Sequence, residues 1–272
     1  MPYCKVEQAE IYYKDLGEGI PIIMIHGFSP DHRLMTGCME PVFTNRMGYR
    51  RIYIDLPGMG LSKNYDSIRN SDEMLKAVQD FTQTIIPDQK YIIIGESYGG
   101  YIARGVINRK EEQLLGAAFI CPVIVPLLKN RGVEKYKIIK MDKQFISKLS
   151  KEELEGFEMN NCVLDEYTWS RYNQEILSGC KIRDEKFLKK IKSNYGFSFL
   201  IDQTEFDKPS VFLLGRQDSP VGYQDALEIM KMYPRGTFAV LDRAAHNLQI
   251  EQPEVFNTLI NEWLDRIEES VY

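Results

Sequence analysis

The chain has 272 residues, 44% of them hydrophobic, and a formal net charge of −5 at pH 7. This length suits a single α/β sheet with one core, and the acidic balance argues against nucleic acid as a general partner. No apolar run approaches the roughly 20 residues that cross a bilayer, so we expect no membrane span. Residues 1–7 are polar and lack the apolar centre of a signal peptide.

Segments rich in apolar, β-branched residues alternate with helical segments in the first half of the chain. After two short strands within residues 3–16, the predicted strands are 20–25, 49–54, 91–94 and 117–121. Near-continuous apolar runs are typical of strands that are buried on both faces. Alternation at this spacing predicts a parallel sheet wound with right-handed crossovers. The loops after these strands should therefore meet at the carboxyl edge of the sheet, where such sheets bind ligands.

Helical segments between the strands carry start and stop signals. Asn70 with Glu73 predicts a capping box, and Pro87 ends the helix that follows. A second capping box, Ser150 with Glu153, opens a helix in a later, charged region.

The alternation of predicted strands and helices stops at about residue 126, and no clear strand follows until Pro209. An insertion of this length between two sheet strands should cover the carboxyl edge as a lid. The expected domains are a core of residues 1–125 and 206–272 and a helical cap of residues 126–205. Lysines between positions 129 and 151 alternate with acidic residues, which favours a solvated helix face over an anion site.

The sheet resumes with strands 210–214 and 237–241. A helix from about residue 222 to residue 233 is expected between them. A last helix runs from Pro253, a residue that suits the first helical turn, to about residue 267.

A serine lies at the sharpest predicted turn of the sheet, in the sequence Gly95-Glu96-Ser97-Tyr98-Gly99. A buried strand precedes it and a helix follows, which is the context of a nucleophile elbow. Side chains at positions 95 and 99 would crowd this turn. The free N–H groups at the start of the helix favour negative charge beside Ser97.

A serine hydroxyl needs a base within hydrogen-bond reach, and that base needs a partner that fixes its tautomer. Asp218 follows one late strand and His246 follows the next, in the chain order nucleophile, acid, histidine. Asp242 is a rival for the acid because it is closer in sequence to His246, but we prefer Asp218. His246 would take the proton of Ser97, so activity should fall below about pH 6–7.

An oxyanion needs two N–H donors. We expect the backbone N–H groups of Tyr98 and Phe28 to supply them, with Gly27 allowing close approach of the backbone. The side chains of Phe28 and Tyr98 are then free to line the pocket. His26 is interpreted as a structural residue that pins this loop.

These motifs resemble the α/β-hydrolase fold superfamily over nearly the full chain. The segments that carry the resemblance are His26–Phe28, Asp55–Ser62, Gly95–Gly100, Gly215–Asp218 and the loop at His246. The resemblance implies a mostly parallel eight-stranded sheet with helices on both faces and a helical cap between the sixth and seventh strands. It also implies that the Asp55–Ser62 loop is a turn without chemistry.

The resemblance implies a serine hydrolase, and we favour a carboxylesterase that acts on small or medium esters. Ser97 disfavours the haloalkane dehalogenases and epoxide hydrolases of the superfamily, which use aspartate. Many of its carbon–carbon bond hydrolases carry methionine after the nucleophile, where this chain has Tyr98. An aminopeptidase or amidase, a carbon–carbon bond hydrolase with the same triad, and a ligand-binding protein that retains the fold are the alternatives.

The predicted cap holds the remaining candidates for substrate contact. Trp169 and Tyr172, with Gly27 of the core, are candidate substrate-binding residues, although both cap aromatics also suit packing of the cap on the core. An acidic cap residue would bind the amine of an aminopeptidase substrate. The residues considered for that role are Glu153, Glu155 and Glu158.

The cysteines are scattered and form no Cys-x-x-Cys pair. They are Cys4, Cys38, Cys121, Cys162 and Cys180. An odd number of isolated thiols fits a cytoplasmic protein with reduced cysteines. The chain has only three histidines and no His/Cys cluster, so we expect no metal and no cofactor, and a small-molecule substrate as the partner.

Overall fold

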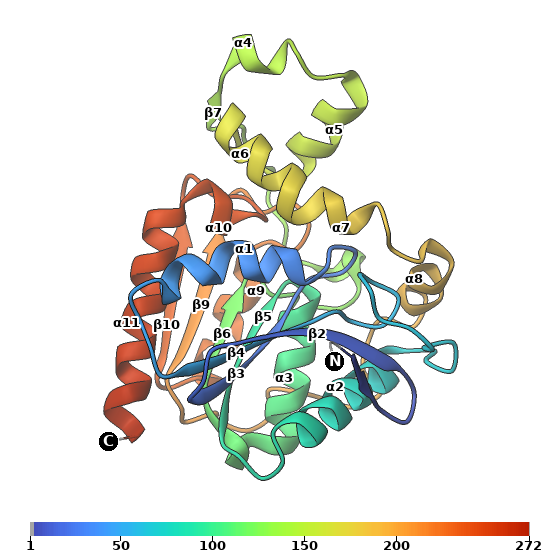
Figure 1. The fold of residues 1–272 in the computed structure, drawn as a ribbon. Helices are drawn as coiled ribbons and strands as arrows, with labels where there is room; N and C mark the ends of the chain where they lie inside the picture. The colour runs from blue at the N-terminus through green and yellow to red at the C-terminus, as the bar shows by residue number, and fades with distance from the viewer. Residues whose placement is uncertain (1–2, 272) are drawn as a thin grey trace.

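The computed structural model describes residues 3–271 and contains one large sheet of eight strands (Figure 1). Their spatial order is β1 (Tyr3–Lys5), β2 (Glu10–Leu16), β4 (Tyr49–Ile54), β3 (Ile20–Ile25), β5 (Tyr91–Glu96), β6 (Leu114–Ile120), β9 (Ser210–Gly215) and β10 (Gly236–Leu241). The pairs β1–β2 and β2–β4 are antiparallel, and the others are parallel. The predicted mostly parallel, eight-stranded sheet is confirmed.

Helices cover both faces of the sheet. The helices α1 (His32–Phe43) and α11 (Pro253–Val271) contact each other on one face, and α2 (Ser71–Ile85) and α3 (Tyr98–Lys110) contact each other on the other. This arrangement explains the apolar runs of the central strands, because each strand must bury both of its faces.

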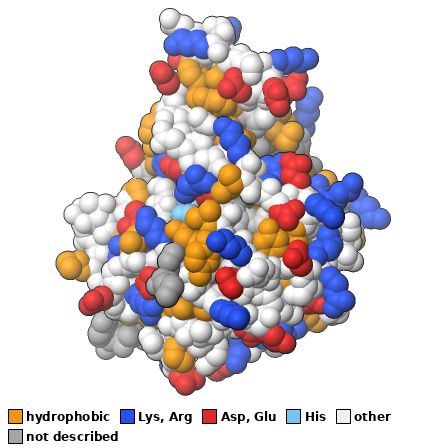
Figure 2. Space-filling view, turned by 45° about the vertical axis from the view of Figure 1, so that its right-hand side comes forward, with side chains coloured by type: hydrophobic (Ala, Val, Ile, Leu, Met, Phe, Trp, Pro, Cys, Tyr) orange, Lys and Arg blue, Asp and Glu red, His pale blue; other side chains and the backbone are white. Residues whose placement is uncertain are grey.

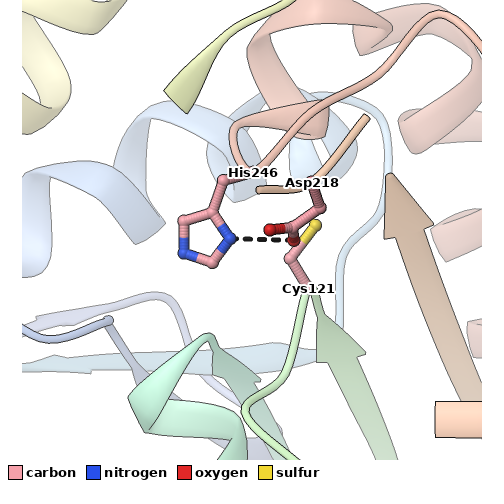
Figure 3. A group of neighbouring side chains, drawn as sticks. All are labelled: Cys121, Asp218 and His246. Atoms are coloured by element: carbon pink, nitrogen blue, oxygen red, sulfur yellow. Dashed lines mark hydrogen bonds and ion pairs between the residues drawn. The ribbon is translucent and has the colours of Figure 1, made fainter. Parts of the chain in front are cut away.

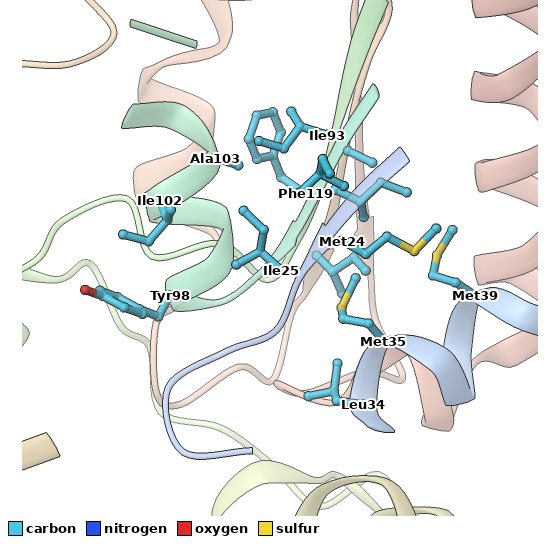
Figure 4. Packing of buried hydrophobic residues seen from close by; sticks show 14 of the residues in the cluster. Met24, Ile25, Leu34, Met35, Met39, Ile93, Tyr98, Ile102, Ala103 and Phe119 are labelled. Carbon is cyan, nitrogen blue, oxygen red and sulfur yellow. The ribbon is translucent and has the colours of Figure 1, made fainter. Parts of the chain in front are cut away.

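Figure 4 shows the side chains that join these layers. Ile102 and Ala103 of α3 lie on one side of the strands, and Met35 and Met39 of α1 lie on the other, with Met24 of β3 between them. All five side chains are fully buried. Burying a side chain such as isoleucine or methionine contributes about 1.5–3 kcal/mol to stability before the cost in entropy.

The two predicted capping boxes form to different extents. The Asn70 side chain accepts the N–H of Glu73, but the Glu73 carboxylate accepts the N–H of Arg69 instead of that of Asn70. At the start of α5, Ser150 and Glu153 cap each other reciprocally, as predicted.

The chain between β6 and β9 stands above the carboxyl edge of the sheet (Figure 1). Its elements are the 3₁₀ turn Leu128–Asn130, β7 (Lys140–Met141), α4 (Lys143–Ile146), α5 (Lys151–Asn160), β8 (Val163–Leu164), α6 (Glu166–Arg171), a π-helical turn at Tyr172–Leu177, α7 (Ser178–Cys180) and α8 (Glu185–Lys192). The expectation of no strand in this region is wrong, because β7 and β8 pair in parallel. Each has two residues, which is too short to leave a periodic pattern in the sequence.

The remaining short elements differ from expectation in length. The helix predicted over residues 222–233 is limited to α9 (Gln224–Glu228) and a 3₁₀ turn at Met230–Met232. Another 3₁₀ turn at Glu111–Gln113 precedes β6, and α10 (Leu248–Glu251) precedes α11. Within residues 3–271, no helix has the length and apolar character needed to cross a membrane.

Candidate active site

The sharp turn at Ser97 joins β5 to α3. Ser97 has φ 51° and ψ −112°, a strained conformation for a residue with a side chain. A Cβ atom at Gly95 would overlap the carbonyl oxygen of Gly99, and one at Gly99 would overlap that of Ile25. Glycine is therefore required on both sides of Ser97, as the sequence pattern predicts.

Three residues from separate strand ends form a chain of hydrogen-bond contacts beside this turn. The Ser97 Oγ lies 3.0 Å from Nε2 of His246, and Nδ1 of His246 lies 2.9 Å from Oδ2 of Asp218. Asp218 is 3% exposed, and its other oxygen accepts the N–H of Val221. Asp218, and not Asp242, is thus the acid that contacts the imidazole.

The surroundings of His246 favour its protonated form. Burial lowers the pKa of the imidazole, but the charge and hydrogen bond of Asp218, with the charge of Glu96, outweigh burial and raise the pKa to about 9. The site therefore stabilises a positive charge on His246, as a histidine that serves as a general base requires.

Glu96 is a site residue that the sequence analysis does not assign. Its side chain is 2% exposed, and Oε1 lies 3.5 Å from Nε2 of His246. Burial, with a smaller contribution from the charge of Asp218, raises the pKa of Glu96 to about 7, against the opposing effects of His246 and of the Gly27 backbone. A Cβ atom at Gly27 would overlap the Glu96 carboxylate. The sequence feature that could have identified Glu96 is its position as an ionisable residue directly before Ser97 in a turn that is predicted to be buried.

Cys121 is a second neighbour of the site that the sequence analysis does not identify. Figure 3 shows its sulfur beside the Asp218–His246 contact. The Sγ atom donates to the carbonyl oxygen of Ala245 at 3.5 Å, and burial raises the pKa of the thiol well above its usual range. Cys121 is therefore a neutral thiol that packs beside the Asp218 carboxylate.

Two groups of described residues have the spacing of metal ligands. They are Cys121, Asp218 and His246, and Asp31, His32 and Asp55. In the first group the acid and the imidazole contact each other. In the second, Asp55 accepts the Leu61 N–H and contacts His32, which fixes the turn after β4. In both groups, the atoms that could bind a metal ion therefore already take part in hydrogen bonds.

The loop after β3 lies against the turn at Ser97. Tyr98 is the first residue of α3, so its N–H has no carbonyl partner within the helix. Phe28 follows Gly27 in the loop. His26 fixes this loop, because its Nδ1–H donates to the Gly27 carbonyl at 2.7 Å and its Nε2 accepts the Leu56 N–H at 3.0 Å.

A buried carboxylate ties the loop of His246 to the segment above the sheet. Glu251 accepts the N–H groups of Cys162 at 2.5 Å, Val163 at 2.9 Å and Ala245 at 2.6 Å. Cys162 and Val163 lie at β8, and Ala245 precedes His246. One side chain therefore holds both segments in register.

Two cavities open at Ser97 and His246. The first has a volume of about 460 Å³ and includes Gly27, Glu96 and Tyr172 in its lining. The second has a volume of about 630 Å³. Phe28, Met159 and Asn160 line both. Figure 2 shows hydrophobic side chains beside Lys and Arg side chains on the surface below the segment that joins β6 to β9.

Three candidate side chains lie away from the cavity linings. The Tyr98 ring, which was expected to be free to line the pocket, is fully buried, and its hydroxyl lies 2.7 Å from that of Ser71. Trp169 packs edge-on against Phe157 and lines neither cavity. Its side chain therefore packs within the segment above the sheet and does not form a cavity wall. Of the acidic candidates, Glu153 caps α5.

Glu155 and Glu158 are likewise absent from both linings. Among the described linings of these two cavities, the acidic side chain is instead Glu96. A further cavity of about 620 Å³ lies at the opposite end of the strands, near Leu114 and Pro209, and neither Ser97 nor His246 lines it.

Comparison with known proteins identifies the same fold family in a family model and in related sequences. A family model described as the alpha/beta hydrolase fold matches residues 20–253. The AB hydrolase superfamily protein YisY of Bacillus subtilis is 25% identical, over 95% of this chain and 97% of that protein. A pimeloyl-[acyl-carrier protein] methyl ester esterase of Legionella pneumophila (strain Corby) is 24% identical, over 93% of this chain and 99% of that protein.

The fold has a solved counterpart. The crystal structure of an alpha/beta superfamily hydrolase from Oenococcus oeni PSU-1 superposes with a TM-score of 0.90 at 30% identity, covering 98% of this chain and all of that one. Other relatives, 22% and 23% identical, are named a 2-hydroxy-6-oxo-6-(2'-aminophenyl)hexa-2,4-dienoic acid hydrolase and a non-heme chloroperoxidase.

Proposed function

This chain belongs to the α/β-hydrolase family, and we propose that it is a serine hydrolase that cleaves carboxylic esters of small to medium size. The observation that carries the proposal is the contact of Ser97 with His246 and of His246 with Asp218, at the mouth of two cavities. A relative named as a methyl ester esterase supports the ester as substrate.

The geometry supports a two-step mechanism. The Ser97 Oγ attacks the carbonyl carbon while Nε2 of His246 takes its proton, and Asp218 stabilises the imidazolium. The N–H groups of Phe28 and Tyr98 donate to the oxyanion. His246 then returns the proton to the departing alcohol, and water, activated by the same imidazole, releases the acid from Ser97.

Residues 126–205 act in this proposal as a cap over the core of residues 1–125 and 206–272. Tyr172 and Met159 of this segment line the cavity wall opposite the sheet. A cap so placed limits the size of the substrate and keeps water from the acyl-enzyme. The five cysteines, all free, support a reducing, cytoplasmic setting.

A carbon–carbon bond hydrolase with the same three residues is the second candidate, because relatives of this chain carry such names. Tyr98 stands where many of those enzymes have methionine. An aminopeptidase has less support, since Glu153, Glu155 and Glu158 do not line the cavities.

The test is hydrolysis of p-nitrophenyl esters of graded acyl length by the wild type and by Ser97→Ala. We expect the variant to lose on the order of a million-fold in turnover. Equal rates in both proteins would exclude Ser97 as the nucleophile. Labelling of Ser97 by a fluorophosphonate, read by mass spectrometry, distinguishes a hydrolase from a ligand-binding protein with the same fold. Cleavage of a vinylogous diketone without ester hydrolysis would favour the second candidate.

A further inference from the structure

The two cavities at Ser97 differ in charge. The smaller is lined by the Glu96 carboxylate and by Arg183, whose guanidinium is already paired with Glu185 at 2.9 Å. The larger is lined by two cations, Arg131 and Lys192, and its described lining contains no acidic side chain. Ser97 and His246 belong to both linings, so one side of the reaction centre faces uncompensated positive charge.

Arg131 is the fixed cation of the larger cavity. Its Nε–H donates to the carbonyl of Val125 at 2.9 Å, one Nη1–H to that of Pro220 at 2.8 Å and one Nη2–H to that of Pro126 at 3.1 Å. These contacts hold the guanidinium plane but do not neutralise it. Across residues 3–271, no carboxylate oxygen lies within 4 Å of its nitrogen atoms.

Other arginines near the site have acidic partners. Arg104 is paired with Asp202, and Arg171 with Glu175. A guanidinium has five N–H donors, and the carbonyls use three of those of Arg131. One further donor remains on each terminal nitrogen. The Tyr195 hydroxyl, which lines the same cavity, is also a hydrogen-bond partner of the guanidinium. The open side of Arg131 therefore offers a ligand its positive charge and an N–H donor, both of which suit a carboxylate oxygen.

We propose that Arg131 binds a carboxylate of the substrate, so that the preferred ester is a monoester of a dicarboxylic acid. The proposal rests on the proposed function and specifies its substrate class. Apolar side chains of the same lining, among them Leu127 and Val221, suit the methylene chain between the two carboxyl groups. Lys192, exposed at the rim, adds positive charge along the approach. The distal carboxylate stays unchanged, because only the ester carbonyl that bonds to Ser97 is hydrolysed.

The competing explanation is that Arg131 serves only to tether three backbone carbonyls. Loss of the tether would lower the rate for every substrate alike. Loss of an anion site would lower it only for substrates that carry the distal carboxylate. The informative quantity is therefore the ratio of kcat/KM for a charged ester to that for a neutral ester of equal chain length.

The experiment uses p-nitrophenyl monoesters of succinic, glutaric, adipic and pimelic acids, each compared with the p-nitrophenyl ester of the monocarboxylic acid of equal chain length. We expect the wild type to prefer the charged ester by about 10- to 100-fold at its best length. Arg131→Met should bring this ratio close to unity, and Arg131→Lys should restore part of it. Arg183→Met is the matched control, because it removes a paired cation from the neighbouring cavity and should leave the ratio unchanged.

Binding tests the same proposal without chemistry. Titration calorimetry of Ser97→Ala with monomethyl adipate and with dimethyl adipate should show tighter binding of the monoester, and Arg131→Met in the same background should abolish the difference. Equal binding of the two esters, or a ratio that Arg131→Met does not change, overturns the proposal. Ester hydrolysis that depends on Ser97 but shows no charge preference would overturn it and leave the proposed function standing.

Discussion

The carboxylate of Glu96 lies 3.5 Å from Nε2 of His246, the same nitrogen that faces Ser97. Asp218 contacts the other nitrogen, Nδ1. The imidazole is thus placed between two buried carboxyl groups. Asp218 contacts Nδ1, whereas Glu96 lies on the side of Ser97 and lines the smaller cavity.

This arrangement predicts an alkaline pH–rate profile. The base must be neutral, and Asp218 and Glu96 raise the pKa of His246 to about 9 against the effect of burial. We expect kcat/KM to rise with pH through this value, above the window of about pH 6–7 that an ordinary histidine suggests. Rates of ester hydrolysis measured from about pH 5 to about pH 10 will show the midpoint. A plateau complete near neutral pH would contradict the prediction.

Replacing Glu96 should move that midpoint. Glu96→Gln keeps the shape of the side chain but removes the negative charge that favours the imidazolium, so the pKa of His246 should fall and the profile should shift to lower pH. Glu158→Gln removes a charge from α5 outside both cavity linings and is the control. An unshifted profile in Glu96→Gln would show that this carboxyl is neutral throughout the working range.

Asp218→Asn should lower kcat by about 10⁴-fold, because an amide orients the ring poorly and does not stabilise the imidazolium. Asp242→Asn is the control, since Asp242 follows β10 at the start of the loop that carries His246, and Asp218 is the carboxylate that contacts the imidazole. Comparable losses in the two variants would mean that the loop, and not the acid, supports the chemistry. Steady-state kinetics on one p-nitrophenyl ester suffices.

Glu251→Gln tests the tie between β8 and the His246 loop. The carboxylate uses both oxygens to accept three backbone N–H groups, whereas glutamine has one acceptor oxygen and would present N–H to N–H at the other position. We expect a loss of about 1–3 kcal/mol in the free energy of unfolding. Urea denaturation will measure it, and Glu254→Gln, at an exposed position of α11, is the control. Wild-type stability would show that water takes the place of the lost acceptor.

The core could be predicted from the sequence because its signals are local and repeated. Apolar strands at regular spacing indicate a parallel sheet, and carboxyl ends of parallel strands meet at one edge. That geometry brings Ser97 within 3.0 Å of His246 across 149 positions of sequence. Their roles remain a proposal, but their proximity follows from the strand pattern.

Features that depend on packing between distant segments could not be predicted in this way. The interleaved charges around residues 129–151 favoured a solvated surface, and nothing in that pattern separates Arg131 from its neighbours. Its position depends on the carbonyls of Val125, Pro126 and Pro220. The burial of Tyr98 likewise depends on contact with Ser71, which belongs to another helix.

The direct pairing of β6 with β9, from Ala117 opposite Ser210 to Ile120 opposite Leu213, has a consequence for how such a protein can diversify. The chain between these strands, residues 121–209, leaves and re-enters the sheet at adjacent positions, about 4.8 Å apart. Its length and sequence can therefore vary without changing the register of any strand. Evolution, or an engineer, can therefore exchange this segment without moving a strand of the large sheet, provided that the new segment still supplies the N–H groups that Glu251 accepts beside the histidine loop.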